Sequence, residues 1–83
     1  MVRVEKLLAR MRSSPRGVRF AQLAAVCDHY FGEPRQQGTS HRVYRMPWRG
    51  DPRVNIQDDH GEAKPYQVRQ VLAAIDKLEG EQS

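Results

Sequence analysis

His41 is the side chain of this sequence best suited to proton transfer near neutral pH. It follows Thr39 and Ser40 and leads into a basic run that contains Arg42 and Arg45. A neutral imidazole with a reference pKa of about 6.5 can take or give a proton. Beside arginines it could act on an RNA 2′-hydroxyl, because attack of that hydroxyl on its own phosphorus needs a base, an acid and cationic stabilisation. A lone histidine beside arginines is also common at strand edges, so spacing alone leaves both interpretations open.

A second basic group stands where the last predicted helix begins. Lys64 directly precedes Pro65, and Arg69 lies one turn further on. The exposed N–H groups of a helix N-terminus favour phosphate, and a lysine beside them strengthens that preference. The alternative is that both residues are ordinary solvated charges at a helix start.

Two weaker groups of candidates accompany these residues. Tyr44 and Trp48 could stack on unpaired bases, or they could cover the edge of the core. Asp58, Asp59 and His60 are contiguous, and contiguous ligands seldom all face one ion. Neither the pair Cys27 and His29 nor His41 has a recognisable zinc-binding spacing. We therefore predict neither a metal nor another cofactor.

The composition favours an anionic partner. The 83 residues include 14 Lys and Arg against 10 Asp and Glu, which gives a net charge of +4. Such a balance is typical of proteins that bind nucleic acid, although arginine is also enriched by GC-rich genomes. Cys27, the single cysteine, excludes an internal disulfide and is predicted to lie in the core. No apolar run approaches the ~20 residues that span a membrane, so we expect a cytoplasmic protein.

Three helical stripes and two alternating segments predict the architecture. The stripes consist of Val4, Leu7, Leu8 and Met11; Phe20, Leu23, Ala24, Cys27, Tyr30 and Phe31; and Val68, Val71, Leu72, Ile75 and Leu78. Strands are expected at 42–46 and 53–57, with a short strand before Gly38 as a third. Residues 58–64 are predicted to form a loop, and Gly80 with the polar tail "EQS" closes the chain. This order predicts an α+β domain with a small antiparallel sheet packed on helices. The exposed sheet face would carry Arg42 and Tyr44 or their alternates, depending on register.

Three segments taken together resemble the HicA family, the toxins of type II toxin–antitoxin systems. They are "VRFAQLAAVCDHYFG", "GTSHRVYRMP" and "RVNIQDDHGEAKPYQVRQVLAAIDKL", in that order. The most specific features are Ser-His before a strand and "KPYQVRQV" at the start of the last helix. The resemblance covers roughly residues 16–78. It implies an α-β-β-β-α fold like that of double-stranded-RNA-binding domains, with a three-stranded antiparallel sheet. Residues 16–79 would be the core of a single domain, 1–83, and residues 1–15 an additional N-terminal helix and turn.

The resemblance also implies a function. HicA toxins are bacterial mRNA interferases, endoribonucleases that cleave mRNA without a cofactor, inhibit translation and are neutralised by a HicB antitoxin. The catalytic histidine of the family falls on His41. Thr39 and Ser40 would support it, and the residues expected to bind RNA are Arg42, Arg45, Lys64 and Arg69. Thr39 stands where the family has glycine, and Arg42 where it often has a second histidine. The alternative is a non-catalytic module on the same fold that binds RNA or a protein partner.

Overall fold

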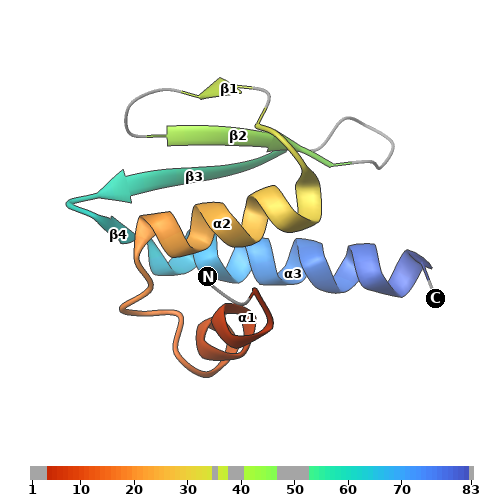
Figure 1. Cartoon of the computed structure of the whole chain (residues 1–83), viewed down its shortest axis with the longest axis horizontal. Helices are drawn as coiled ribbons and strands as arrows, with labels where there is room; N and C mark the ends of the chain where they lie inside the picture. The colour runs from red at the N-terminus through yellow and green to blue at the C-terminus, as the bar shows by residue number, and fades with distance from the viewer. Residues whose placement is uncertain (1–3, 35, 38–40, 47–52, 83) are drawn as a thin grey trace.

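The computed structural model describes residues 4–34, 36–37, 41–46 and 53–82, and these form an α+β protein (Figure 1). The elements are α1 (Val4–Ser13), α2 (Phe20–Phe31), β1 (Gln36–Gln37), β2 (His41–Arg45), β3 (Arg53–Asp59), β4 (Glu62–Ala63) and α3 (Pro65–Gln82). The expected class, three helices with an antiparallel sheet, is confirmed. The three expected strands are β1, β2 and β3, and β4 is an additional short strand at the sheet edge. Thr39, Ser40 and Trp48 lie outside the described residues.

The segment expected as a loop at 58–64 folds instead into a hairpin. β3 continues to Asp59, which pairs with Glu62 of β4. His60 and Gly61 make the turn, with φ values of 55° and 86°. A two-residue hairpin of type I′ requires positive φ at both positions, which glycine adopts freely and histidine more readily than most residues. The loop prediction was wrong because this backbone pairing outweighs the low strand propensity of the aspartates.

The helices form two layers on one side of the sheet. α2 and α3 both pack against β3, and α1 packs on α2 and α3 from the side away from the sheet (Figure 1). The helical stripes predicted from the sequence are the buried faces of these helices. Leu7 and Met11 of α1 belong to the same hydrophobic cluster as Leu23, Ile56 and Ile75. Among the described helices, none combines the length and the apolar composition needed to cross a bilayer.

The ends of two helices show how local sequence sets their limits. α2 is followed by Gly32, whose φ of 82° is the positive value expected of a glycine cap. Its N–H donates to the Asp28 carbonyl at 3.1 Å. The last helix, by contrast, does not end at Gly80, because α3 continues to Gln82. A glycine costs a helix only about 1 kcal/mol relative to alanine, so one glycine need not end it.

The two central strands have one face buried by helices and one face directed away from them. Tyr44, Val54 and Ile56 are buried on the helix side. Residues alternate between faces along a strand, so their neighbours lie on the other side. We call this second side the open face; it consists of His41, Val43 and Arg45 of β2 and Arg53, Asn55 and Gln57 of β3. All are exposed except Val43, which is 7% exposed and lies outside the main core cluster.

Candidate functional site

His41 is the first residue of β2 and lies exposed at one end of the open face. The antiparallel register places it directly opposite Gln57 of β3. Side chains of directly opposed residues project from the same face of a sheet, with Cβ atoms about 4.5–5.5 Å apart. Within the described part of the chain, no hydrogen bond or ion pair engages the imidazole. The ring is therefore accessible to a substrate laid over this face.

Gln57 connects the position of His41 with that of Lys64. Together with Asp58, Asp59 and Lys64, it lines a hollow of about 230 Å³ beside the start of α3. Lys64 is half-buried there, and its carbonyl accepts from the N–H groups of the first helical turn. Strand pairing thus brings His41 and Lys64, far apart in the sequence, to the same end of the sheet. The two carboxylates in this hollow outnumber the single positive charge of Lys64, so its lining carries a formal charge of −1.

Gln67 is a residue at this site that sequence reasoning missed. Its side chain is buried, and its Oε1 accepts from the backbone N–H of Gln57 at 2.8 Å. β4 pairs with β3 only at Asp58 and Asp59, so the Gln57 N–H lies just beyond the paired edge. The amide of Gln67 satisfies this donor and fixes the start of α3 beside β3. One feature of the sequence could have indicated this role: Gln67 directly precedes Val68 and lies on the buried side of the last helix.

Replacing Gln67 by methionine is expected to lower the free energy of unfolding by about 1–3 kcal/mol, because the Gln57 N–H loses its acceptor in a partly buried place. Gln70→Met is the matched control, since Gln70 is exposed on the same helix. That change should stay within about 0.5 kcal/mol. Urea denaturation of both variants measures the difference. Equal losses would show that the Gln67 hydrogen bond adds nothing to stability.

Arg42 lies on the opposite side of the sheet from His41. Its Nη1 is 3.5 Å from Asp28 Oδ2, and its guanidinium lies over the Phe20 ring, 5.8 Å from the centroid. Tyr44 is also on this side, and its hydroxyl donates to Asp28 Oδ1 at 2.6 Å. The structure therefore does not bring Arg42 together with His41. It also places Tyr44 in the core, which agrees with the second of the two roles considered for it.

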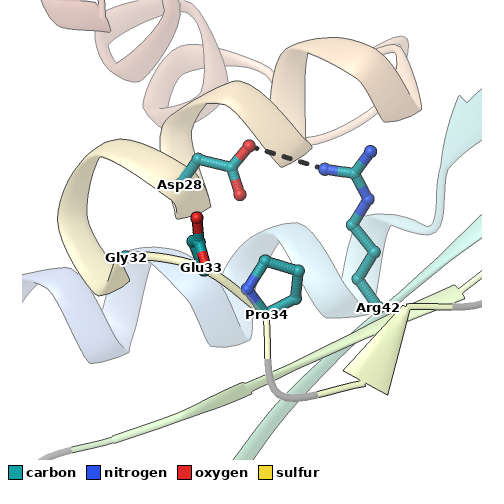
Figure 2. Close-up of a pocket in the computed structure, with 5 residues that line it drawn as sticks. All are labelled: Asp28, Gly32, Glu33, Pro34 and Arg42. Atoms are coloured by element: carbon teal, nitrogen blue, oxygen red, sulfur yellow. Dashed lines mark hydrogen bonds and ion pairs between the residues drawn. The ribbon is translucent and has the colours of Figure 1, made fainter.

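Arg42 borders a second hollow, of about 550 Å³, at the end of α2. Figure 2 shows Arg42 reaching from β2 toward Asp28, with Glu33 and Pro34 on the segment that leaves the helix. One guanidinium and two carboxylates line this hollow, so its formal charge is −1. The role of Asp28 could not be predicted from the sequence, because its partners belong to β2, a strand distant in the chain.

Burial suppresses the acidity of two groups next to Asp28. Desolvation raises the pKa of the Tyr44 phenol well above its ordinary value, and the hydrogen bond to Asp28 raises it further. Burial likewise raises the pKa of the Cys27 thiol. The buried, protonated thiol is not a nucleophile, in agreement with the core position predicted for Cys27.

The other predicted residues fall at different places. Arg45 lies on the open face with His41, four residues further along β2, which corresponds to roughly 13 Å. Arg69 is exposed on α3, on the side of the sheet opposite to the open face. Thr39 and Ser40, expected to support His41, belong to the segment outside the described residues.

The aspartates considered as metal ligands serve the β3–β4 turn. Asp58 Oδ1 accepts from the Gly61 N–H at 2.5 Å, and Asp59 Oδ1 is 2.9 Å from His60 Nδ1. Across the residues that the structure describes, no three His, Cys, Asp or Glu side chains are grouped as metal ligands would be. The run Asp58 to His60 is thus accounted for by turn geometry.

Comparison of the chain with protein-family models, with curated proteins and with solved structures finds no match. The site is therefore defined by its own geometry. It combines an exposed histidine, an arginine on the same sheet face, and a lysine beside the residue opposite the histidine. These groups can exchange a proton and contact an anion, the two capacities that cleavage of a phosphodiester requires.

Proposed function

We propose that this protein is a HicA-type toxin, a metal-independent endoribonuclease that cleaves mRNA and inhibits translation in the cytoplasm. The observation that carries the proposal is the exposed position of His41 on a sheet face that also bears arginines. The sequence resemblance through Ser-His and "KPYQVRQV" supports the same conclusion. The order α2, β1, β2, β3, α3 supports the finer fold, a domain like those that bind double-stranded RNA, with β4 and α1 as additions.

The proposed reaction uses the 2′-hydroxyl of RNA as its nucleophile. His41 accepts the proton of that hydroxyl as its oxygen attacks the adjacent phosphorus. The bond from phosphorus to the 5′-oxygen breaks, and that oxygen takes a proton from the His41 imidazolium or from water. The products are a 2′,3′-cyclic phosphate and a 5′-hydroxyl end. Cationic side chains near the phosphate stabilise the negative charge that develops on its oxygens.

A substrate lacking one hydroxyl tests this chemistry. We expect the purified protein to cleave an RNA oligonucleotide in the presence of EDTA and to leave cyclic phosphate ends, which mass spectrometry identifies. The same oligonucleotide with a single 2′-deoxynucleotide at the cut site should resist cleavage, because it has no nucleophile. Cleavage of the deoxy substrate would contradict the proposed mechanism. Loss of activity in EDTA would show that the reaction needs a metal ion.

Two partners belong to this proposal, mRNA as substrate and a HicB-type antitoxin as inhibitor. Co-expression with a HicB-like protein from the neighbouring reading frame should restore growth. A second candidate function is RNA binding without catalysis, which the arginines of the open face could provide without His41. Salt-dependent binding of RNA that is never cut would favour this second function.

A further inference from the structure

We propose that Tyr66 stacks on a nucleobase of the RNA substrate, close to the bond that is cut. The inference rests on the proposed function, from which the ligand, an RNA strand, is taken. It assigns a role to a residue for which the sequence predicted none. The position lies at the start of α3, beside the edge of the sheet.

Tyr66 is the large hydrophobic side chain that the described part of the chain leaves exposed. It lies in the first turn of α3, and 52% of its surface is accessible to solvent. Tyr44, which the sequence offered for stacking on a base, is fully buried. An aromatic ring can stack on any base, because every base has a π-face. Tyr66 is therefore placed to contact a nucleobase whatever its identity.

The ring of Tyr66 is tethered by the buried amide of Gln67. Nε2 of Gln67 donates to the Tyr66 hydroxyl at 3.3 Å, while Oε1 accepts from the backbone N–H of Gln57 at 2.8 Å. Gln67 is only 3% exposed, so its amide has little freedom to move. A ring that is already oriented loses less conformational freedom when a base binds to it.

The same hydrogen bonds place Tyr66 near His41. The Gln57 N–H is directed to Gln67 and therefore away from β2. In an antiparallel ladder such a residue forms a non-hydrogen-bonded pair with its partner, here His41, with Cα atoms about 4.5 Å apart. His41, Gln57, Gln67 and Tyr66 are thus successive neighbours. They span on the order of 10 Å, which a stacked strand covers in about three nucleotides at about 3.4 Å each.

The charge beside this end of α3 favours a base over a phosphate as the group that meets the ring. Asp58, Asp59 and Lys64 line the neighbouring hollow together with Gln57, and the formal charge of this lining is −1. Two carboxylates repel a phosphate. A base carries no charge, and its stacking on an aromatic ring does not require a cation. The neutral part of the RNA is therefore the part that fits here.

A protein partner fits the surroundings of Tyr66 less well. Protein interfaces usually have a centre built from several aromatic or aliphatic side chains. Among the described residues, Tyr66 is the one large hydrophobic side chain that is exposed, and the exposed residues that follow it on α3, Arg69 and Gln70, are charged or polar. A single ring among polar residues is suited to a single base.

Removal of one base at a time tests this inference. In a His41→Ala background, which prevents cleavage, we would measure the binding of a short RNA oligonucleotide of mixed sequence and of a set in which each nucleotide in turn is abasic. The proteins compared are the His41→Ala parent and the same protein with Tyr66→Ala or Tyr66→Phe. Cleavage by the unmodified protein locates the cut in the same oligonucleotide. Thermal unfolding confirms that each variant is folded.

The matched control is His29→Ala. His29 is another exposed aromatic side chain, near the end of α2. The opposite end of this helix contacts the β3–β4 turn, where the Phe20 N–H donates to the Gly61 carbonyl at 3.0 Å. His29 is therefore remote from the start of α3, and its loss should leave RNA binding unchanged.

Tyr66→Ala should weaken RNA binding by at least about fivefold, the smallest loss expected for one stacked base. The slope of log affinity against log salt should stay the same, because no phosphate contact is lost. Tyr66→Phe keeps the ring and should bind RNA within about twofold of the parent. In the parent, one abasic position within about three nucleotides of the cut should weaken binding by a similar factor. The same position should have no further effect in the Tyr66→Ala protein, because the two changes remove one contact.

Three results would overturn the inference. The first is an unchanged RNA affinity of the Tyr66→Ala protein. The second is a set of abasic losses that is the same with and without Tyr66. The third is a Tyr66→Ala protein that keeps its affinity for RNA but no longer binds a HicB-type protein, because Tyr66 would then serve a protein interface.

Cleavage by the unmodified protein separates this inference from the proposed function. If RNA is cleaved in a His41-dependent way while Tyr66→Ala binds RNA normally, the proposed function stands and the inference fails. If one abasic position depends on Tyr66 but the unmodified protein never cleaves RNA, the inference stands and the proposed function fails.

Discussion

Replacing His41 by alanine is expected to abolish RNA cleavage and growth arrest while leaving the fold intact. A positioned acid–base group contributes about 10²–10⁴-fold to a rate, so a loss of that size is expected. The side chain is exposed at the first residue of β2, and its removal takes nothing from the core. Single-turnover cleavage of a labelled RNA measures the rate, and induced expression in a bacterial host measures the growth arrest.

The control for this experiment is a histidine elsewhere on the surface. His60 is almost fully exposed in the β3–β4 turn, and its positive φ is compatible with asparagine. His60→Asn should therefore retain both cleavage and stability. Cleavage that survives in the His41→Ala variant would remove His41 from the mechanism. A His41→Ala variant that binds RNA like the unmodified protein would confirm that the loss is in the chemistry and not in binding.

Asp28→Ala is expected to lower the free energy of unfolding by about 1.5–3 kcal/mol, because the buried Tyr44 hydroxyl loses a charged acceptor. Tyr44→Phe removes the same hydrogen bond and keeps the ring, so it should cost less. In the Tyr44→Phe background, replacing Asp28 by alanine should lower the free energy of unfolding only slightly. Urea denaturation of the four proteins gives the coupling energy, expected to be about 1–2 kcal/mol.

Glu33→Ala is the matched control, because Glu33 is an exposed acid lining the same hollow as Asp28. It should change stability by less than about 0.5 kcal/mol. Cleavage by the Asp28 variant should remain normal below its melting temperature, since the Asp28–Tyr44 pair lies on the side of the sheet away from His41. A coupling energy near zero would show that the hydrogen bond to Asp28 does not stabilise the fold.

The raised pKa of Tyr44 makes the stability of the protein depend on pH in the alkaline range. As pH rises through the ordinary phenol pKa of 10.0, the unfolded chain loses this proton first, while the folded chain keeps it. The stabilisation is therefore complete below that pH and is lost as pH rises toward the higher pKa of the folded state. Cys27 acts in the same direction from its ordinary value of 9.0. Between pH 7 and pH 11, the free energy of unfolding should fall less steeply with pH for the Tyr44→Phe variant than for the unmodified protein.

Local patterns predicted the helices and the two long strands because their apolar spacing is sustained over several turns or alternations. The β3–β4 hairpin escaped prediction because its turn is His60–Gly61, and its strand residues are acidic. Hairpin formation there depends on positive φ at a histidine, which sequence patterns rarely signal. Pairing with β4 then carries Asp58 and Asp59 into a strand that their own propensity disfavours.

The candidate site shows a different limit of sequence reasoning. His41 and Arg42 are adjacent in the chain, and for that reason they were expected to act together. Neighbours along a strand project from opposite faces, and the register that decides which face is open is set by pairing and packing. The same pairing brings Gln57 opposite His41 and so links the histidine with Lys64. The proximity of His41 and Lys64 to Gln57 therefore cannot be predicted from any single segment of the sequence.

The packing of α1 against both α2 and α3 has a consequence for the synthesis of this protein. Leu7 and Met11 need α3 beside them to be buried, and Arg12 of α1 pairs with Asp76 of α3. A nascent chain that has emerged only through the sheet cannot close this core. Folding must wait until α3 has left the ribosome. The proposed active surface would then form only after α3 has emerged from the ribosome. Until that moment the nascent chain would not cleave the mRNA from which it is being translated.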